Sequence, residues 1–238
     1  MTDASTQMKT LPSLVELLEA GVHFGHDRSK QNPKMKSFIF MQRNRVGILD
    51  LEQTLSSLEV AAKFLQNMAQ NPSKEILFVG TKRQAREAVK TAAKASNMPY
   101  VTKRWLGGTL TNFSTILKSI EKLDELKASE NTTDNEKMTK KEQSVRRKEI
   151  SRLEAVLEGM KAMRTLPAAL VVVGAYDEKL AILEAKRVGI PVVGIVDTNA
   201  NPDLLDYPIP ANDDAVRSVS LIVDALAKAV VAGRTGKR

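Results

Sequence analysis

The feature that most constrains the fold is a strand-and-helix unit that occurs twice along the chain. In the first copy, the apolar run Ile76–Val79 precedes an alanine-rich helical stretch at 84–96. In the second, an apolar run at 168–173 precedes a helical stretch at 178–188 and a further apolar run at 190–196. Strands that alternate with helices form parallel sheets covered on both faces, because each crossover helix must pack back onto the sheet. The sequence therefore predicts a doubly wound α/β fold.

The segments outside these units supply further elements. Two short apolar runs, 38–40 and 46–49, bracket a basic turn and predict a pair of strands. Apolar residues at steps of three and four predict an amphipathic helix over 51–69 and a closing helix over 215–231. The sheet domain is therefore expected to carry helices both before its first strand and after its last.

Two charged helical stretches, 109–128 and 140–164, lie between the repeated units and are joined by a polar, acidic linker. Each has an apolar stripe too narrow for a core of its own, so the pair is expected to form an antiparallel helical hairpin that projects from the sheet. We therefore expect residues 1–108 and 166–238 to form the sheet domain and residues 109–165 to form an inserted hairpin.

Composition narrows the class of protein. The 238 residues include no cysteine, which excludes disulfides, thiolate zinc sites and cysteine nucleophiles. No apolar run approaches the roughly 18 residues of a membrane span, and the N-terminus lacks the apolar core of a secretion signal. We therefore expect a cytoplasmic protein with no membrane partner. Lysine and arginine total 36 against 28 acids, and the resulting formal charge of +8 favours a polyanionic partner.

The basic residues gather in three stretches. Residues 28–45 contain no acid, residues 82–104 contain only Glu87, and a third group opens the second hairpin helix. The third group is equally consistent with an ordinary solvated helix face. Three groups in three elements imply a broad electrostatic footprint that suits a large folded RNA, because each neutralised phosphate adds salt-sensitive affinity. The basic residues expected to bind RNA are Arg28, Lys30, Lys34, Lys36, Arg43, Arg45, Lys82, Arg83, Lys103, Arg104, Arg146 and Arg147.

The only tryptophan, Trp105, directly follows Arg104. An arginine beside an exposed aromatic ring can pair with a phosphate while the ring stacks on a base. We therefore expect Trp105 to be exposed and to contact RNA.

The only two histidines, His23 and His26, could be metal ligands. No cysteine and no nearby carboxylate cluster in the sequence completes a site around them. We therefore expect no metal, and expect the histidines to shape a glycine-rich turn or to lend a ring to an RNA contact.

Five aspartates form the densest acidic group and follow a predicted strand. Paired carboxylates can bind magnesium or act as acid and base. The surrounding asparagines and prolines favour turns and helix caps instead, so we predict no catalytic role for them. These aspartates are Asp197, Asp203, Asp206, Asp213 and Asp214.

Gly80-Thr81-Lys82 resembles the end of a phosphate-binding loop, but the glycine that such a loop needs five residues earlier is absent. No serine lies in a nucleophile elbow. We therefore predict a protein that is not an enzyme, with no cofactor and no small-molecule substrate. The alternative is an α/β enzyme or binding protein for a small phosphorylated ligand, which would bind or turn over that ligand when purified alone.

Ordered blocks spread over nearly the whole chain resemble the ribosomal protein two family of the bacterial small subunit. The blocks are 17–26 (LLEAGVHFGH), 32–36 (NPKMK), 78–84 (FVGTKRQ), 104–108 (RWLGG), 110–113 (LTNF), 189–192 (GIPV), 196–199 (VDTN) and 210–218 (PANDDAVRS). The chain departs from the usual family pattern at Gln31, where a tryptophan is common, and at 174–177, where two basic residues are usual.

The resemblance implies a flavodoxin-like, doubly wound parallel sheet with an inserted antiparallel helical hairpin. It implies a structural component of the small ribosomal subunit that binds 16S ribosomal RNA and acts in translation, and it adds Asn112 to the expected RNA-binding residues. It also implies contacts with other small-subunit proteins, notably the mRNA-binding protein one. A scaffold that acts on protein partners mainly through residues 109–164 is compatible with this reading.

Overall fold

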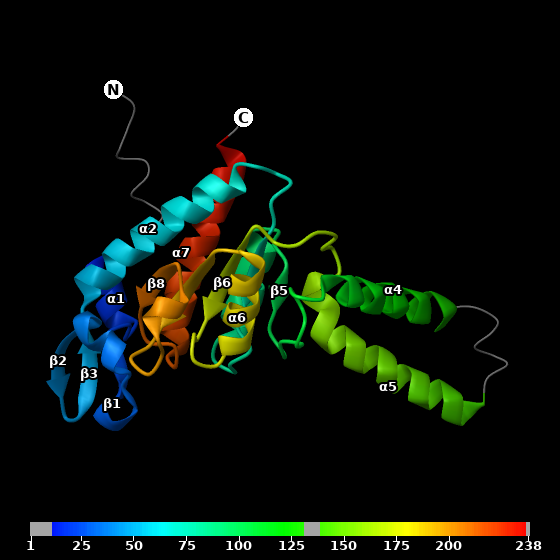
Figure 1. Ribbon diagram of the computed structural model, residues 1–238, viewed down its shortest axis with the longest axis horizontal. Helices are drawn as coiled ribbons and strands as arrows, with labels where there is room; N and C mark the ends of the chain where they lie inside the picture. The colour runs from blue at the N-terminus through cyan, green and yellow to red at the C-terminus, as the bar shows by residue number, and fades with distance from the viewer. Residues whose placement is uncertain (1–10, 131–138, 237–238) are drawn as a thin grey trace.

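A five-stranded parallel sheet lies at the centre of the structure, a computed structural model that describes residues 11–130 and 139–236 (Figure 1). The strand order β5-β4-β6-β7-β8 places the switch point of a doubly wound sheet between β4 and β6. This confirms the predicted flavodoxin-like α/β class. The strands are β4 (Ile76–Val79), β5 (Tyr100–Val101), β6 (Ala169–Val173), β7 (Val192–Val196) and β8 (Tyr207–Pro210).

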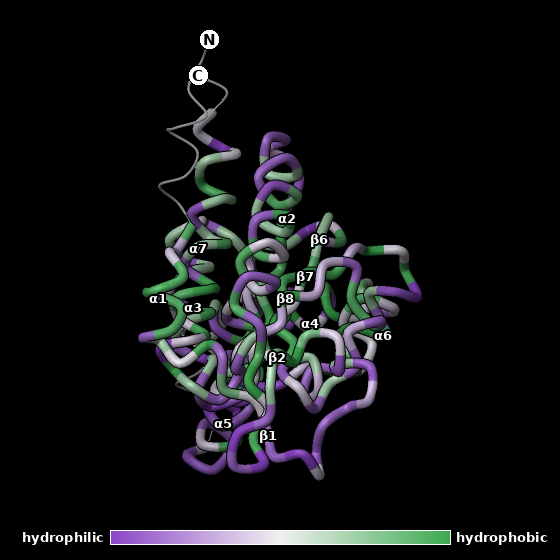
Figure 2. Tube along the Cα trace, turned by 90° about the vertical axis from the view of Figure 1, so that its left-hand side faces the viewer, coloured by the Kyte–Doolittle hydropathy of each residue, from purple (hydrophilic) through white to green (hydrophobic). Residues whose placement is uncertain are grey.

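Alternate residues of each strand enter two separate hydrophobic cores, because successive side chains of a strand point to opposite faces. Ile76 and Phe78 pack in the core beneath three helices, and Leu77 and Val79 pack in the core on the other face. The first face is covered by α2 (Leu51–Ala69), α3 (Arg86–Ala95) and α7 (Val216–Thr235), with α1 (Leu14–Glu19) beside them. The second is covered by α6 (Lys179–Val188) and by the base of the hairpin. Figure 2 shows hydrophobic residues concentrated between these layers.

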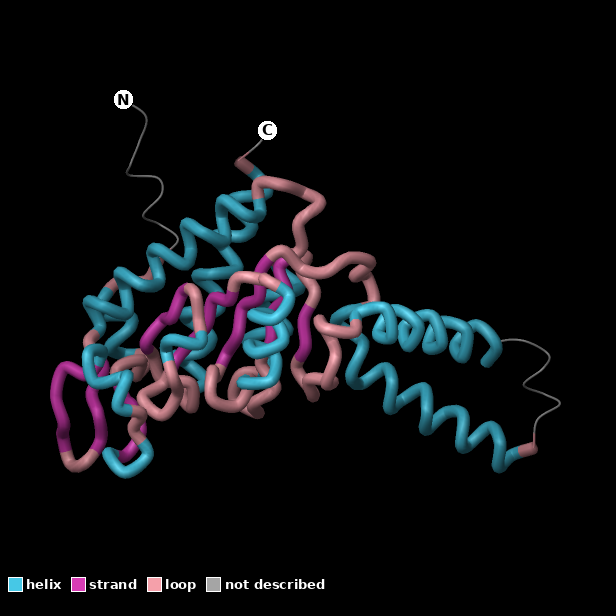
Figure 3. Tube along the Cα trace, in the orientation of Figure 1, coloured by secondary structure: helices cyan, strands magenta, loops and turns pink. Residues whose placement is uncertain are grey.

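A second, three-stranded antiparallel sheet lies at one end of the molecule, apart from the central one (Figure 3). We call it the N-terminal sheet; its strands are β1 (Phe24–Asp27), β2 (Ile39–Arg43) and β3 (Val46–Leu49), in the order β1-β3-β2. Two short 3-10 helices, η2 (Arg28–Lys30) and η3 (Pro33–Phe38), connect β1 to β2.

The turn between β2 and β3 has two residues with positive φ, Asn44 at 48° and Arg45 at 67°. Positive φ at both central positions is the type I′ geometry, whose twist matches that of the flanking strands. The predicted pair of strands with a basic turn is therefore confirmed. The strand β1 was not predicted, because the glycines and histidines around it indicate a turn.

The hairpin consists of α4 (Phe113–Glu130) and α5 (Lys140–Leu157) and extends away from the sheet domain (Figure 1). Ile120, Leu123 and Ile150 are buried between the helices and the sheet domain, and Lys122 pairs with Glu149 at 2.6 Å. A short 3-10 helix, η4 (Glu158–Met160), leads back towards β6. Both helices lie inside the range 109–165, whose exact limits stay a prediction. The linker residues 131–138 lie outside the described part of the chain.

The edge strand β8 was missed in a stretch that two prolines and several aspartates mark as turn-rich. Proline lacks a backbone N–H and is tolerated at a sheet edge, where β8 pairs only with β7. The closing helix runs further than expected, to Thr235. Within the described residues, no helix combines the length and the apolarity that crossing a membrane requires.

Candidate nucleic-acid interface

The loops that follow the five parallel strands meet at one edge of the sheet, where open α/β sheets hold their ligands. Arg83 follows β4, and Lys103 and Arg104 follow β5; all three side chains are exposed. In the described parts of the chain, no ion pair or side-chain hydrogen bond engages any of them. We call these three residues the basic edge. Their charges are available to a partner.

Lys82, the fourth basic residue expected at this edge, is bound within the chain. Its Nζ lies 2.6 Å from Asp213 Oδ1 and 2.6 Å from Asp214 Oδ1, and only 17% of its side chain is exposed. Burial alone would lower the pKa of Lys82, but hydrogen bonds to Asp213 and Asp214 outweigh it and raise this pKa. The ammonium therefore neutralises internal carboxylates, and we do not assign Lys82 to a phosphate.

The expectation that Trp105 is exposed is wrong. The residue is 7% exposed and packs in the core on the hairpin side of the sheet. Its indole Nε1–H donates to Glu184 Oε1 at 3.1 Å. Burying the large apolar ring of an indole is favourable when its single N–H finds a hydrogen-bond partner, as it does here. Trp105 anchors the loop and is not placed to stack on a base.

Glu184, from α6, organises this loop as a whole. Its two carboxylate oxygens also accept backbone N–H groups from Gly108 at 2.8 Å, from Leu110 at 3.0 Å and from Thr111 at 3.3 Å. Burial acts to raise the pKa of Glu184, but the hydrogen bonds dominate and lower it. The charged carboxylate thus fixes the loop that begins at the basic edge and ends at α4.

The predicted residue Asn112 lies at the end of this loop and is exposed. Its Oδ1 accepts a hydrogen bond from the Thr115 hydroxyl at 2.9 Å, so the side chain stabilises the first turn of α4.

The first basic stretch is exposed on η2 and η3, which connect β1 to β2, and on the β2–β3 hairpin of the N-terminal sheet. Two of its cations are paired, Lys34 with Asp203 and Arg45 with Asp27, the latter at 3.4 Å. Both pairs are exposed, and exposed pairs of this kind hold their partners by only about 1 kcal/mol or less. The remaining predicted cations of this stretch are exposed and engage in no ion pair among the described residues; they are Arg28, Lys30, Lys36 and Arg43.

Thr198, in the loop after β7, attaches the N-terminal sheet to the sheet domain. Its Oγ1 accepts the backbone N–H of His26 at 2.8 Å, and its carbonyl accepts that of Asn32 at 2.7 Å. The backbones approach so closely that a Cβ at Gly25 would lie 2.5 Å from the Thr198 methyl carbon. This contact sets the position of the first basic stretch relative to the central sheet.

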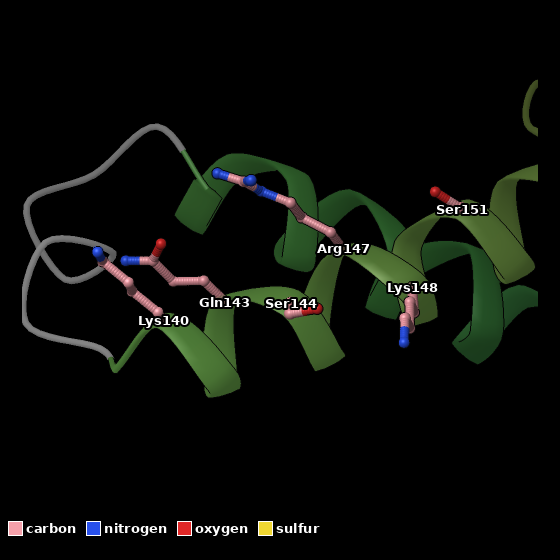
Figure 4. Close-up of a pocket in the computed structure, with 6 residues that line it drawn as sticks. All are labelled: Lys140, Gln143, Ser144, Arg147, Lys148 and Ser151. Carbon is pink, nitrogen blue, oxygen red and sulfur yellow. The ribbon is translucent and has the colours of Figure 1, made fainter.

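The two arginines predicted in α5 play different parts. Arg146 is half-buried and donates to the Leu126 carbonyl of α4 at 3.2 Å, so it helps to hold the hairpin together. Arg147 is exposed and lines a shallow hollow along one side of α5 (Figure 4). The residues of this hairpin face are Lys140, Gln143, Ser144, Arg147, Lys148 and Ser151. Their charged groups are all cationic.

A second hollow, bordered by α1, α3 and α7, has the opposite character. Its charged lining consists of Glu16, Glu19, Glu87, Asp224 and a single arginine, Arg217. Such a surface repels phosphate. The cationic features therefore lie on the basic edge, the N-terminal sheet and the hairpin face.

The structure corrects the statement that no carboxylates accompany the histidines. His26 Nδ1 lies 3.1 Å from Asp197 Oδ1, and Nε2 lies 3.3 Å from Asp214 Oδ2. The Asp197 side chain raises the pKa of His26. Burial and the charge of Asp197 raise the pKa of nearby Asp213 to about 6. No local signal in the sequence links His26 to these aspartates, which become its neighbours only when β1 packs on the loops after β7 and β8.

Fold and surface together define a class of protein: a basic flavodoxin-like domain with a helical hairpin, whose available cations are spread over several elements instead of converging in one closed cleft. The family described as ribosomal protein S2 matches residues 17–233. The small ribosomal subunit protein uS2 of Coprothermobacter proteolyticus is 49% identical over 226 residues, covering 95% of this chain and 84% of that relative. The protein of the same name from Pseudoalteromonas translucida is 52% identical over 222 residues, covering 93% of this chain and 91% of that relative.

The chain therefore belongs to the ribosomal protein S2 family. This is a family of structural proteins and not of enzymes. This family membership agrees with the family resemblance that the sequence blocks indicated.

Proposed function

We propose that this chain is a structural component of the small ribosomal subunit that binds 16S ribosomal RNA in the cytoplasm. The observation that supports the proposal most directly is the set of exposed cations that the rest of the described chain leaves unpaired, above all Arg83, Lys103 and Arg104. The names of the relatives, small ribosomal subunit proteins, support the same assignment.

The distribution of charge suits a large polyanion better than a small one. The basic edge lies at the carboxyl ends of β4 and β5, whereas the N-terminal sheet adjoins the loop after β7. A small phosphorylated ligand needs cations that converge, and RNA offers one phosphate per nucleotide along a path. We infer that both surfaces contact the RNA backbone, with Arg28, Lys30, Lys34, Lys36, Arg43, Arg45, Arg83, Lys103 and Arg104 as the contacting residues.

The hairpin face provides a third contact surface, through Arg147, Lys140 and Lys148. The hairpin extends away from the sheet domain, so it can reach a neighbour that the sheet domain does not touch (Figure 1). We infer that the hairpin contacts RNA or a neighbouring small-subunit protein. The mRNA-binding protein one remains the protein partner that the family resemblance implies.

The phosphate-ligand alternative loses its principal residue in the structure. It was motivated by Gly80-Thr81-Lys82 and by the aspartates near Asp197, and Lys82 is paired with two carboxylates, those of Asp213 and Asp214. A small anion would have to displace two carboxylates from the Lys82 ammonium. That displacement is unfavourable, because it breaks a buried ion pair and leaves a buried charge without its partner.

The experiment that tests the proposal is sedimentation of the tagged chain in cell extract, combined with binding of the purified chain to 16S ribosomal RNA at several salt concentrations. We expect the chain to sediment with small subunits, and we expect log affinity to fall linearly with log salt. A chain that remains at the top of the gradient and binds a nucleotide or sugar phosphate would contradict the proposal and support the alternative.

A further inference from the structure

The N-terminal sheet turns one of its faces to solvent, because the other face is packed within the chain. At Gly25, β1 packs against the loop after β7, and the side-chain amide of Gln42 in β2 donates to Gln31 Oε1 at 2.7 Å. Successive side chains of a strand point to opposite faces of a sheet. Phe24 and Met41, the residues before Gly25 and Gln42, therefore point away from the packed face.

An apolar row crosses the open face from one edge of the sheet to the other. The register pairs Phe24 of β1 with Ile48 of β3, and Ile48 with Met41 of β2. Directly paired side chains of neighbouring strands lie side by side on one face. Phe24 is 50% exposed and Met41 is 47% exposed, so both ends of the row are accessible to a partner.

Phe40 adds a second aromatic ring to this edge of the sheet. Ile39 and Met41 pair with adjacent residues of β3, so Phe40 between them is the extra residue of a β-bulge. A bulge changes the direction in which a side chain points, and Phe40 is 73% exposed, more than any other large hydrophobic residue in the described chain. β2 is also an edge strand at one end of the molecule, where a partner can approach (Figure 3).

The ring of Phe24 is already ordered in the free chain. Its centroid lies 4.0 Å from that of the half-buried His23 ring, with 40° between the two planes. The His23 carbonyl accepts the backbone N–H of Leu49 at 2.8 Å, which fixes this segment against β3. A ring that is ordered in advance loses less conformational entropy when a ligand packs on it.

The charges around the open face favour a nucleic acid as its occupant. Arg43, two residues beyond Met41 in β2, lies in the next row of the same face, and Lys36 and Arg45 are exposed on either side of the strand. Asp27, the acid of that row, is paired with Arg45 at 3.4 Å. Cations attract phosphates while exposed rings stack on bases, so a cationic rim around aromatic rings suits RNA better than an apolar protein segment.

We propose that this face binds unpaired nucleotides of RNA, whose bases stack on Phe24 and Phe40 while Arg43 and Arg45 hold the adjoining phosphates. We call it the aromatic face; its residues are Phe24, Phe40, Met41 and Arg43. The inference rests on the proposed function and deepens it, because phosphate contacts alone do not separate single-stranded from double-stranded RNA. Every base has a π face, so such a surface selects unpaired nucleotides without selecting a sequence.

The test is a fluorescence-anisotropy titration of the purified full chain with a short, labelled single-stranded RNA and with the duplex of the same sequence. Phe40→Ala should weaken binding of the single strand about 5- to 100-fold, the range for loss of one stacked base, and should leave duplex binding unchanged. Phe40→Leu keeps apolar bulk without a ring and should lose affinity, whereas Phe40→Tyr should retain it. Leu18→Ala, at a 53% exposed apolar residue of α1, is the matched control, with unchanged affinity expected.

A measurement on the unaltered chain guards against variants that fail to fold. Ultraviolet irradiation of small subunits that contain the chain should crosslink a nucleotide to the tryptic peptide 37–43. Of the two aromatic rings in this peptide, only that of Phe40 is exposed.

The proposal is overturned if Phe40→Ala binds the single strand as tightly as the unaltered chain, if Phe40→Leu keeps full affinity, or if peptide 37–43 forms no crosslink. It is also overturned if Phe40→Ala weakens incorporation into small subunits at unchanged RNA affinity, because the face then binds a protein. In these cases the salt-dependent binding of 16S ribosomal RNA by the unaltered chain would persist, and the proposed function would stand. An unaltered chain that binds no RNA would refute both.

Discussion

The carboxylate of Glu184 accepts the indole N–H of Trp105 at 3.1 Å, although the two residues are 79 positions apart. The same carboxylate accepts three backbone N–H groups of the loop that follows Trp105. A helix on one face of the sheet thus holds the loop that begins at the basic edge. The position of Arg104 depends on a residue that no phosphate would touch.

Replacement Glu184→Gln should lower the free energy of unfolding by about 2 to 4 kcal/mol, because it removes charge-assisted hydrogen bonds and turns an amide donor towards buried donors. Urea unfolding followed by circular dichroism measures this loss. Glu121→Gln, at an exposed position of α4, is the matched control and should change stability by less than about 0.5 kcal/mol. Equal effects of the two replacements would show that the Glu184 contacts contribute nothing.

The Glu184 carboxylate should also produce a pH dependence in acid. Its pKa is lower in the folded chain than the ordinary value of 4.5, so the folded state binds the proton more weakly than the unfolded state. The resulting stability is fully present above pH 4.5 and is lost as the pH falls through the lower, folded pKa. Between pH 6 and pH 3, unfolding free energy should therefore fall more steeply for the unaltered chain than for Glu184→Gln. Parallel profiles would contradict this.

Charge reversal at the basic edge should weaken RNA binding without unfolding the chain. Arg83→Glu and Arg104→Glu change exposed side chains that make no ion pair in the described structure. Each should weaken incorporation into small subunits and reduce the slope of log affinity against log salt by about 1. Lys63→Glu, at an exposed position of α2, is a control of equal charge change. Incorporation equal to that of the control would remove these arginines from the interface.

Two glycine replacements should separate the attachment of the N-terminal sheet from general effects of a methyl group. In Gly25→Ala the added Cβ would lie 2.5 Å from the Thr198 methyl carbon, so the sheet must shift and stability should fall by about 1 to 3 kcal/mol. In Gly107→Ala the added Cβ meets no atom within 4 Å, and stability should be unchanged or rise slightly. Thermal melting compares the two. Identical melting temperatures would show that Thr198 does not constrain β1.

The buried strands of the central sheet could be predicted from sequence because each is a short apolar run with its own turn signals. The run Ile76–Val79 is recovered without error, and the run at 168–173 differs by one residue from β6. The elements that were missed, β1 and β8, contain glycine, histidine and proline, which indicate turns locally. They become strands because an adjacent strand supplies the hydrogen-bond partners, and a single sequence does not show that partner.

Of the candidate interface, only the charge of its residues could be predicted from the sequence. Exposure of Arg83 and Arg104 follows from their charge, but the burial of Trp105 depends on Glu184 from another helix. Lys82 and Arg83 are adjacent and chemically alike, yet only Lys82 is paired with internal carboxylates. Such differences arise from tertiary neighbours, which charge patterning does not contain.

The Thr198 contacts also dictate an order of events during synthesis. His26 is made early, but the hydroxyl that receives its backbone N–H lies 172 positions later. At about 5 to 20 residues per second, the partner follows after roughly 10 to 35 s. During that interval the acid-free stretch 28–45 leaves the exit tunnel before the partner that positions it exists. A growing chain therefore exposes this cationic stretch before Thr198 has been made, and only the contacts with Thr198 then fix its position.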